Sequence, residues 1–190
     1  MKKSLKIIRI LTVAPIMAFC LFTLTYVYRN QYFSTPWQYI YSLFCLCVLP
    51  LLAYPLQRFI PGLCDRGREG QRSLAIIFSV IGYILCCVFG LIFTQSIELW
   101  IITLTYLLSG VGIFISSKVF KFKISGHACG VFGPVGVLFY FGLYIPAAIG
   151  VGLGALVYYA SLKSGRHTLP ELIGGTVLPT ILMTLFILIF

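Results

Sequence analysis

Acidic residues are scarce in this chain, which has 4 Asp and Glu residues against 14 Lys and Arg and is only 9% charged. A water-soluble domain has about a quarter charged residues, so a surface this poor in charge does not suit water. Hydrophobic residues occupy 60% of the 190 positions. They form long runs rather than short alternating segments, which favours membrane helices over a β-barrel. The composition therefore predicts an all-α fold, a polytopic transmembrane helical bundle.

Cysteine and carboxylate patterns that would hold a metal ion are also missing. The seven cysteines are odd in number, include no CxxC pair and lie mostly inside apolar runs. We interpret them as small packing residues rather than as zinc ligands or a disulfide framework. Since the carboxylates are too few to bind a metal, the sequence predicts a protein without a metal or another cofactor.

The basic excess gives a net charge of +10. In a soluble protein this charge would indicate nucleic acid as a partner. Here the basic residues cluster in short connections between apolar runs and do not alternate with aromatic residues along one stripe. This pattern is typical of membrane topology and of anionic lipid head groups. We expect the lipid bilayer, and no nucleic acid, as a partner.

Apolar runs of about 15–23 residues, a length that crosses a bilayer as a helix, recur along the chain. They span residues 10–28, 37–56, 74–94, 99–117, 128–141, 144–162 and 172–190. The fifth is short and glycine-rich and could be a tilted or partly re-entrant segment, so six to seven spans are predicted. The first is longer than a signal-peptide core and has no small-x-small cleavage site, so we expect it to be retained.

No internal repeat or long linker interrupts the chain. We therefore treat residues 1–190 as a single membrane domain, with N-terminal spans in 1–117 and a core in 118–190 that contains both histidines. The longest polar connection, residues 58–72, is interpreted as a solvated loop.

Basic residues also predict the orientation, because they accumulate on the cytoplasmic side of membrane proteins. With the N-terminus in the cytoplasm, only Arg29 falls outside. The inner set is then Lys2, Lys3, Lys6, Arg9, Arg58, Arg66, Arg68, Arg72, Lys118, Lys121, Lys123, Lys163 and Arg166. We predict a multi-pass cell-membrane protein with its N-terminus inside and its C-terminus outside.

The only two histidines, His127 and His167, each have basic residues, a glycine and a hydroxyl nearby. They are 40 positions apart, and two predicted spans lie between them. Because two crossings return a chain to the side that it left, both histidines should lie at the same membrane face, here the cytoplasmic one.

This combination of residues suits a phosphate group. Ser125 and Gly126 open the fifth span, where backbone N–H groups and the positive end of the helix dipole attract anions. Cationic side chains neutralise the charge on a phosphoryl group. The candidates are Lys118, Lys121, Lys123, Lys163 and Arg166.

Histidine supplies the reactive groups. One histidine can attack phosphorus and hold a phosphoryl group, while a second protonates the leaving oxygen. Glu171 lies four residues after His167. If a helix begins near Pro170, its carboxylate can reach back to the imidazole and orient it, as the acid of a catalytic triad does.

The segments 124–128 (ISGHA) and 165–171 (GRHTLPE), the latter followed by Gly174, resemble the central and last motifs of the type 2 phosphatidic acid phosphatases. The distance between the two segments is also similar to that family. The resemblance implies His167 as the nucleophile, His127 as the general acid and Glu171 as the orienting carboxylate. It further implies metal-independent hydrolysis of a membrane lipid or polyprenyl phosphate or diphosphate.

The family pattern is incomplete in this chain. Its first motif, a lysine followed after six residues by Arg-Pro, is not recognisable, and the arginine of its last motif falls on Ser161. We expect Lys118, Lys121 or Lys123, with Lys123 preferred, and Arg166 or Lys163 to replace these cations.

Three alternatives therefore stay open: a non-catalytic lipid-phosphate-binding protein, a small transporter, and a phosphotransferase with an acceptor other than water. The lysines could also serve only as membrane anchors, and Glu171 could also cap the last helix.

Overall fold

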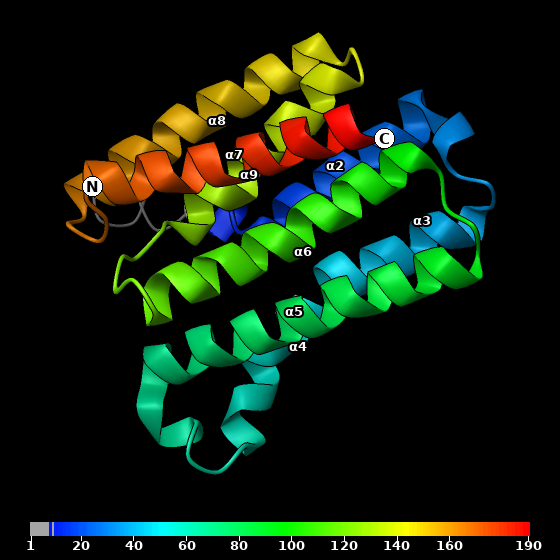
Figure 1. The fold of residues 1–190 in the computed structure, drawn as a ribbon. Coiled ribbons are helices and arrows are strands. Elements are labelled where there is room, and N and C mark those ends of the chain that lie inside the picture. Colours follow the sequence, from blue (N-terminus) through cyan, green and yellow to red (C-terminus); the bar gives the residue numbers. More distant parts are fainter. Residues whose placement is uncertain (1–7, 9) are drawn as a thin grey trace.

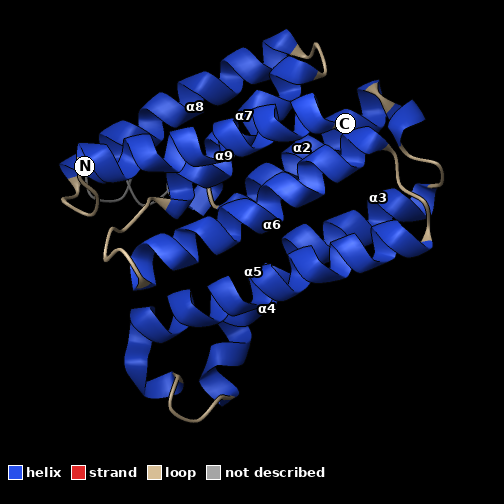
Figure 2. Cartoon of the chain, viewed as in Figure 1, coloured by secondary structure: helices blue, strands red, loops and turns tan. Residues whose placement is uncertain are grey.

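The computed structural model describes residue 8 and residues 10–190, and this part of the chain contains helices and no strands (Figures 1 and 2). The predicted all-α class is confirmed. The principal helices are α2 (Ala14–Tyr28), α3 (Pro36–Leu43), α4 (Leu49–Leu56), α5 (Gly67–Ile92), α6 (Ile97–Lys118), α7 (Gly126–Tyr140), α8 (Tyr144–Lys163) and α9 (Leu169–Ile189). The predicted cytoplasmic residues Lys2, Lys3, Lys6 and Arg9 lie outside the described residues.

Each of the seven predicted apolar runs contains helix. Within the described residues, five helical stretches are long and apolar enough to cross a membrane: Pro36–Phe59, Ser73–Ile92, Ile97–Lys118, Tyr144–Lys163 and Leu169–Ile189. Two shorter apolar helices, α2 and α7, accompany them. The chain is thus a polytopic helical membrane protein, and the fifth run is as short as its sequence indicated.

The second stretch contains a wider π turn at Phe44–Val48 between α3 and α4. Pro50 lies two residues after this turn, and a proline has no N–H to donate to the carbonyl four residues earlier. A π turn is one of the ordinary ways in which a helix accommodates such an interruption. The stretch therefore continues as one long apolar helical segment, Pro36–Phe59, despite its prolines.

The prediction for the 58–72 connection is partly wrong, because α5 begins at Gly67 rather than after residue 72. Gln57 explains the compactness of the remaining loop. Its buried side-chain amide donates hydrogen bonds to the carbonyls of Leu63, at 2.6 Å, and Gly67, at 2.9 Å. These bonds hold the two ends of the loop between Gln57 and Gly67 together, and α5 therefore begins before residue 72.

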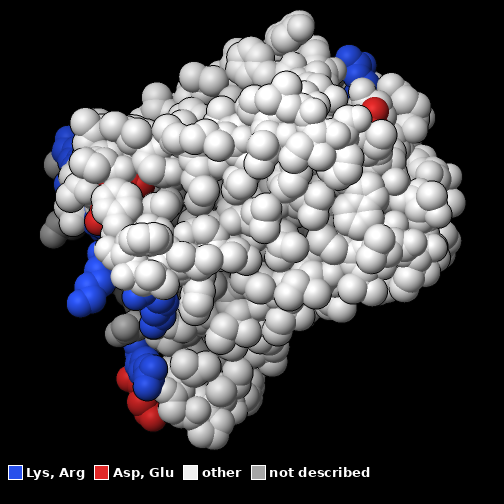
Figure 3. Space-filling view, in the orientation of Figure 1, with Lys and Arg blue, Asp and Glu red and all other residues white. Residues whose placement is uncertain are grey.

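The connections gather at two opposite ends of the bundle (Figure 1). The α4–α5, α6–α7 and α8–α9 connections lie at one end, and the α2–α3, α5–α6 and α7–α8 connections lie at the other with the C-terminus. We call the first the motif end, since both histidine segments belong to it. Most Lys and Arg side chains visible in Figure 3 also gather there.

Helix α7 lies at the centre of the packing, against α2, α8 and α9. Its glycines allow this close contact: a methyl group added at Gly130 would lie 2.7 Å from the Cβ atom of Ala14 in α2. At the far end of α7, Arg29 donates hydrogen bonds from Nε, at 3.1 Å, and Nη2, at 2.9 Å, to the carbonyl of Phe141. His127, at the N-terminal end of α7, therefore belongs to a helix that is closely packed against its neighbours.

Candidate functional site

The first turn of α9 positions Glu171. Thr168 is the N-cap of the helix, and Pro170 and Glu171 follow in its first turn. Proline suits this place because its missing N–H would have no partner within the helix. The Oε2 atom of Glu171 accepts the backbone N–H of Thr168 at 3.3 Å, which is one half of a capping box. The carboxylate is therefore held beside the residue that precedes the helix.

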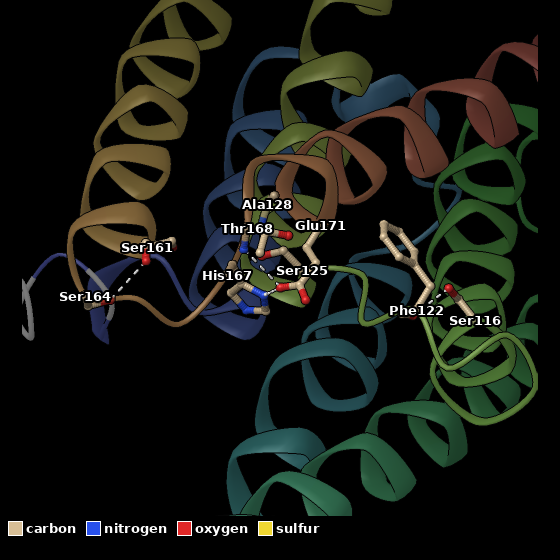
Figure 4. Close-up of polar contacts among 9 residues, drawn as sticks. All are labelled: Ser116, Phe122, Ser125, Ala128, Ser161, Ser164, His167, Thr168 and Glu171. Carbon is tan, nitrogen blue, oxygen red and sulfur yellow. Dashed lines mark hydrogen bonds and ion pairs between the residues drawn. The ribbon is translucent and has the colours of Figure 1, made fainter.

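His167 lies within hydrogen-bonding distance of this carboxylate. Its Nδ1 atom is 2.7 Å from Oε2 of Glu171, and the two side chains are 14% and 18% exposed (Figure 4). The four-residue spacing predicted this contact, and the structure confirms it. Because an ionised carboxylate only accepts hydrogen bonds, the proton of a neutral imidazole belongs on Nδ1 and the lone pair on Nε2.

The end of α8 directs the chain into this site. Gly165 adopts a left-handed φ of 60°, which glycine tolerates without strain. The N–H of Gly165 donates to the carbonyl of Leu162 at 3.0 Å, and that of Arg166 donates to Ser161 at 3.2 Å. This pair of bonds is the Schellman arrangement that ends many helices. It reverses the chain within a short connection, so Arg166 and His167 lie directly before α9.

An open depression surrounds the His167–Glu171 pair. Its lining consists of Gly165, Arg166, His167, Thr168 and Glu171. Arg166 is exposed and His167 is partly exposed. The site is thus open to its surroundings at the motif end.

The start of α7 is bonded to the start of α9. The backbone N–H of Ser125 donates to the carbonyl of Glu171 at 3.0 Å. The Ser125 hydroxyl accepts the N–H of Ala128 at 3.4 Å and so caps α7, and the residue is fully buried (Figure 4). His127 is the second residue of α7 and is partly buried. The two histidine segments therefore meet at adjacent helix N-termini. The two-crossing topology predicted that they lie at the same end of the bundle, but it did not predict this contact.

This role of Ser125 was not predicted from the sequence, which placed it and Gly126 at the phosphate. The hydroxyl of Ser125 is occupied in capping, whereas Gly126 is exposed and has open space around its Cα atom. A phosphate contact of either residue stays a prediction. The structure assigns Ser125 the additional task of joining the two segments.

Gly175 makes the contact between α7 and α9 possible. A methyl group added there would collide with the backbone oxygen of Ser125 and would lie 2.9 Å from Cβ of Ala128. We expect Gly175→Ala to separate the two helix ends and to destabilise the protein by about 1–3 kcal/mol, as overpacking does. Thermal unfolding in detergent and hydrogen exchange of the Ser125 amide measure the two effects.

Gly152→Ala is the matched control, since a methyl group at Gly152 in α8 would meet nothing within 4 Å. This variant should leave the exchange of the Ser125 amide unchanged. Equal exchange of that amide in both variants would contradict the importance of the Gly175 contact.

The predicted cations occupy different places. Lys123 is exposed and interacts favourably with the negative charge of Glu171. The side chain of Lys163 lies along helix α8. Its Nζ atom is 2.5 Å from the Tyr159 hydroxyl and 4.9 Å from the centre of the Tyr159 ring. Lys118 ends α6 and Lys121 lies in the next connection, both exposed. The structure thus places Arg166 in the depression with the His167–Glu171 pair and places Lys163 against Tyr159.

Ser116 and Phe122 shape the connection that contains Lys121 and Lys123, and neither was singled out from the sequence. The Ser116 hydroxyl donates to the carbonyl of Phe122 at 2.8 Å, and the N–H of Phe122 donates to the carbonyl of Ser116 at 3.0 Å (Figure 4). The Phe122 ring lies beside Gly174 of α9. A serine near a helix end is too common a pattern to have indicated this contact.

Among the described residues, no three His, Cys, Asp or Glu side chains are grouped so that they could hold one metal ion. Searches of protein-family models, curated proteins and solved structures find no match to this chain. The function is therefore argued from the residues and geometry of the site.

Proposed function

We propose that this chain is a metal-independent membrane phosphatase that hydrolyses a lipid or isoprenoid phosphate or diphosphate through a phosphohistidine. The proposal rests mainly on one observation: His167 Nδ1 lies 2.7 Å from Glu171 Oε2 at the start of α9. The resemblance of the segments around His127 and His167 to the type 2 phosphatidic acid phosphatases supports the same reaction.

In the first step, Nε2 of His167 attacks phosphorus and the bond from phosphorus to the leaving oxygen breaks. His127 gives its proton to that oxygen, so the lipid leaves as a neutral alcohol when the substrate is a monoester. Glu171 stabilises the positive charge that develops on the imidazole of His167. The hydrogen bond between Ser125 N–H and the Glu171 carbonyl keeps both helix ends in register for this step.

In the second step, a water molecule attacks the phosphohistidine. His127 takes a proton from this water as its oxygen bonds to phosphorus, and the bond from phosphorus to Nε2 breaks. Inorganic phosphate leaves, and both histidines return to their starting states. The same acceptor position could take an alcohol in place of water, which would make the reaction a phosphoryl transfer.

Positively charged groups form the phosphate-binding site in this proposal. Arg166 lines the depression with His167 and Glu171, and the charge of Lys123 favours the ionised form of Glu171. The N–H groups that begin α7 at Gly126 add the positive end of a helix dipole. We assign Lys118, Lys121 and Lys163 to the outer part of the site, where they attract an anionic head group. Such charges stabilise the oxygens of the phosphoryl group in the transition state.

Replacing Glu171 with glutamine is expected to lower turnover by roughly 10²-fold with little effect on folding. The amide keeps nearly the same size but removes the negative charge that favours a cationic imidazole. Initial rates of phosphate release measure the effect. Glu98→Gln is the matched control, because Glu98 also lies in the first turn of a helix but at the other end of the bundle. Equal losses of activity in the two variants would contradict the role of Glu171.

We propose that the motif end faces the cytoplasm, because all the basic residues of the connections except Arg29 belong to it. Cysteine labelling tests this orientation in a variant whose exposed Cys20 and Cys64 are replaced by serine. A membrane-impermeant maleimide added to intact cells should label Asn30→Cys and should label Ser164→Cys only after lysis. The opposite pattern would reverse the orientation.

The direct test of the activity uses purified protein in detergent with a panel of lipid monophosphates and isoprenoid diphosphates. We expect release of inorganic phosphate from at least one of them in the presence of EDTA. Binding of these lipids without any release would favour the non-catalytic alternative. Appearance of the phosphoryl group on a second lipid would indicate a phosphotransferase.

A further inference from the structure

A cavity of about 60 Å³ lies inside the bundle, apart from the depression at His167. Its walls come from α2, α5, α6, α7 and α9, and it extends as far as Gly126, the first residue of α7. The walls are mostly apolar, but three hydroxyl-bearing residues of α6 contribute to them. These residues are Thr105, Tyr106 and Ser109.

The three hydroxyls have no solvent access, and none of them makes a hydrogen bond to a nitrogen or oxygen atom of the described residues. Ser109 lies beside the Cys129 thiol, which is only a weak hydrogen-bonding partner. Thr105 is 3% exposed and Ser109 is 4% exposed. A buried hydroxyl without a partner is unfavourable, and buried polar groups in proteins are nearly always satisfied by protein or by ordered water. Three such groups on the wall of a single cavity therefore indicate a polar ligand within it.

Other hydroxyls in these helices behave differently. Thr25, Ser79, Thr103, Thr176, Thr180 and Thr184 each donate to the carbonyl four residues earlier, at distances between 2.7 and 3.2 Å. This local bond is the usual way in which serine and threonine are satisfied within membrane helices. Thr105 and Ser109 do not make it, although they lie on the same helix as Thr103.

The volume of the cavity suits water. A buried water molecule needs roughly 10–15 Å³ and two to four polar partners, so a few molecules fit between these hydroxyls. An acyl or prenyl chain would fill the space but would leave all three hydroxyls without partners. The cavity is therefore better matched to water than to a lipid tail.

We propose that this cavity is a hydration site, in which a small cluster of water molecules is bound by Thr105, Tyr106 and Ser109 inside the bundle. The small residues of α7, including Gly126 at its start, leave the space for this cluster. The site is independent of the phosphatase proposal, since no residue that binds the water belongs to the His167–Glu171 pair.

Water-edited solid-state NMR of the full chain in lipid bilayers tests the proposal. We expect the side-chain signals of Thr105 and Ser109 to gain magnetisation from water several-fold faster than the signal of Thr103. Thr103 is the matched control because it is buried on the same helix and its hydroxyl bonds to the Leu99 carbonyl. Transfer to Thr105 and Ser109 as slow as that to Thr103 would overturn the hydration site.

A second experiment examines the same site without labelling. If the hydroxyls bind water, Thr105→Val and Ser109→Ala should lower the thermal midpoint of unfolding, because each removes a satisfied group. Midpoints that are unchanged or raised, together with saturable binding of xenon to the parent protein, would indicate a dry cavity and would overturn the proposal.

Discussion

His167→Ala is expected to lower phosphate release by roughly 10³-fold or more, because this change removes the atom that bonds to phosphorus. The loss should appear in kcat rather than in KM. Lys123, Arg166 and the α7 N-terminus, which bind the phosphate in this account, all stay in place. Initial rates on the best lipid substrate measure the change.

Two controls accompany this variant. Binding of vanadate, a phosphate analogue, should persist in His167→Ala at an affinity within several-fold of the parent protein. Ser164→Ala, a change at an exposed position three residues earlier, should keep full activity. Unchanged turnover in His167→Ala would exclude a phosphohistidine at this residue.

His127→Ala is expected to remove the group that protonates the leaving oxygen. With an alkyl phosphate, whose leaving oxygen needs a proton, we expect the rate of cleavage to fall by about 10²–10⁴-fold, the usual contribution of a general acid. With p-nitrophenyl phosphate the first step should change little, because nitrophenolate leaves without a proton. A rapid burst of nitrophenol followed by slow turnover is the expected result, since His127 also assists the second step.

The comparison of the two substrates separates this role from a structural one. A misplaced α7 would slow both substrates to the same degree, because it would disturb the phosphate site as a whole. Equal losses on alkyl and nitrophenyl phosphate, without a burst, would therefore contradict general acid catalysis by His127.

Several features of the site follow from local sequence. The four-residue spacing of His167 and Glu171, with Pro170 between them, predicts a helix start that lets the carboxylate reach the imidazole. The prediction is correct because Thr168 and Glu171 cap that helix by themselves. The apolar runs predicted the five long apolar helices and the two shorter ones of the described residues for a similar reason. A helix in a membrane satisfies its own backbone hydrogen bonds, so its apolar run can be identified without knowledge of its neighbours.

Other features depend on packing between distant segments. The bond from Ser125 N–H to the Glu171 carbonyl exists because Gly175 lets α7 and α9 approach closely, and no local pattern indicates that approach. The early start of α5 depends on the two hydrogen bonds of Gln57 within a connection whose polar sequence indicated a solvated loop. Long cationic side chains are hardest to place, as the position of Lys163 against Tyr159 illustrates.

The most direct test is to trap the phosphorylated enzyme. The parent protein is mixed for a short time with a lipid phosphate carrying a labelled phosphoryl group, stopped in alkali and analysed by mass spectrometry. We predict a phosphoryl group that is stable to alkali and labile to acid on the peptide containing His167, and its absence in His167→Ala. Phosphate release without label on this peptide, or label on another residue, would contradict the account.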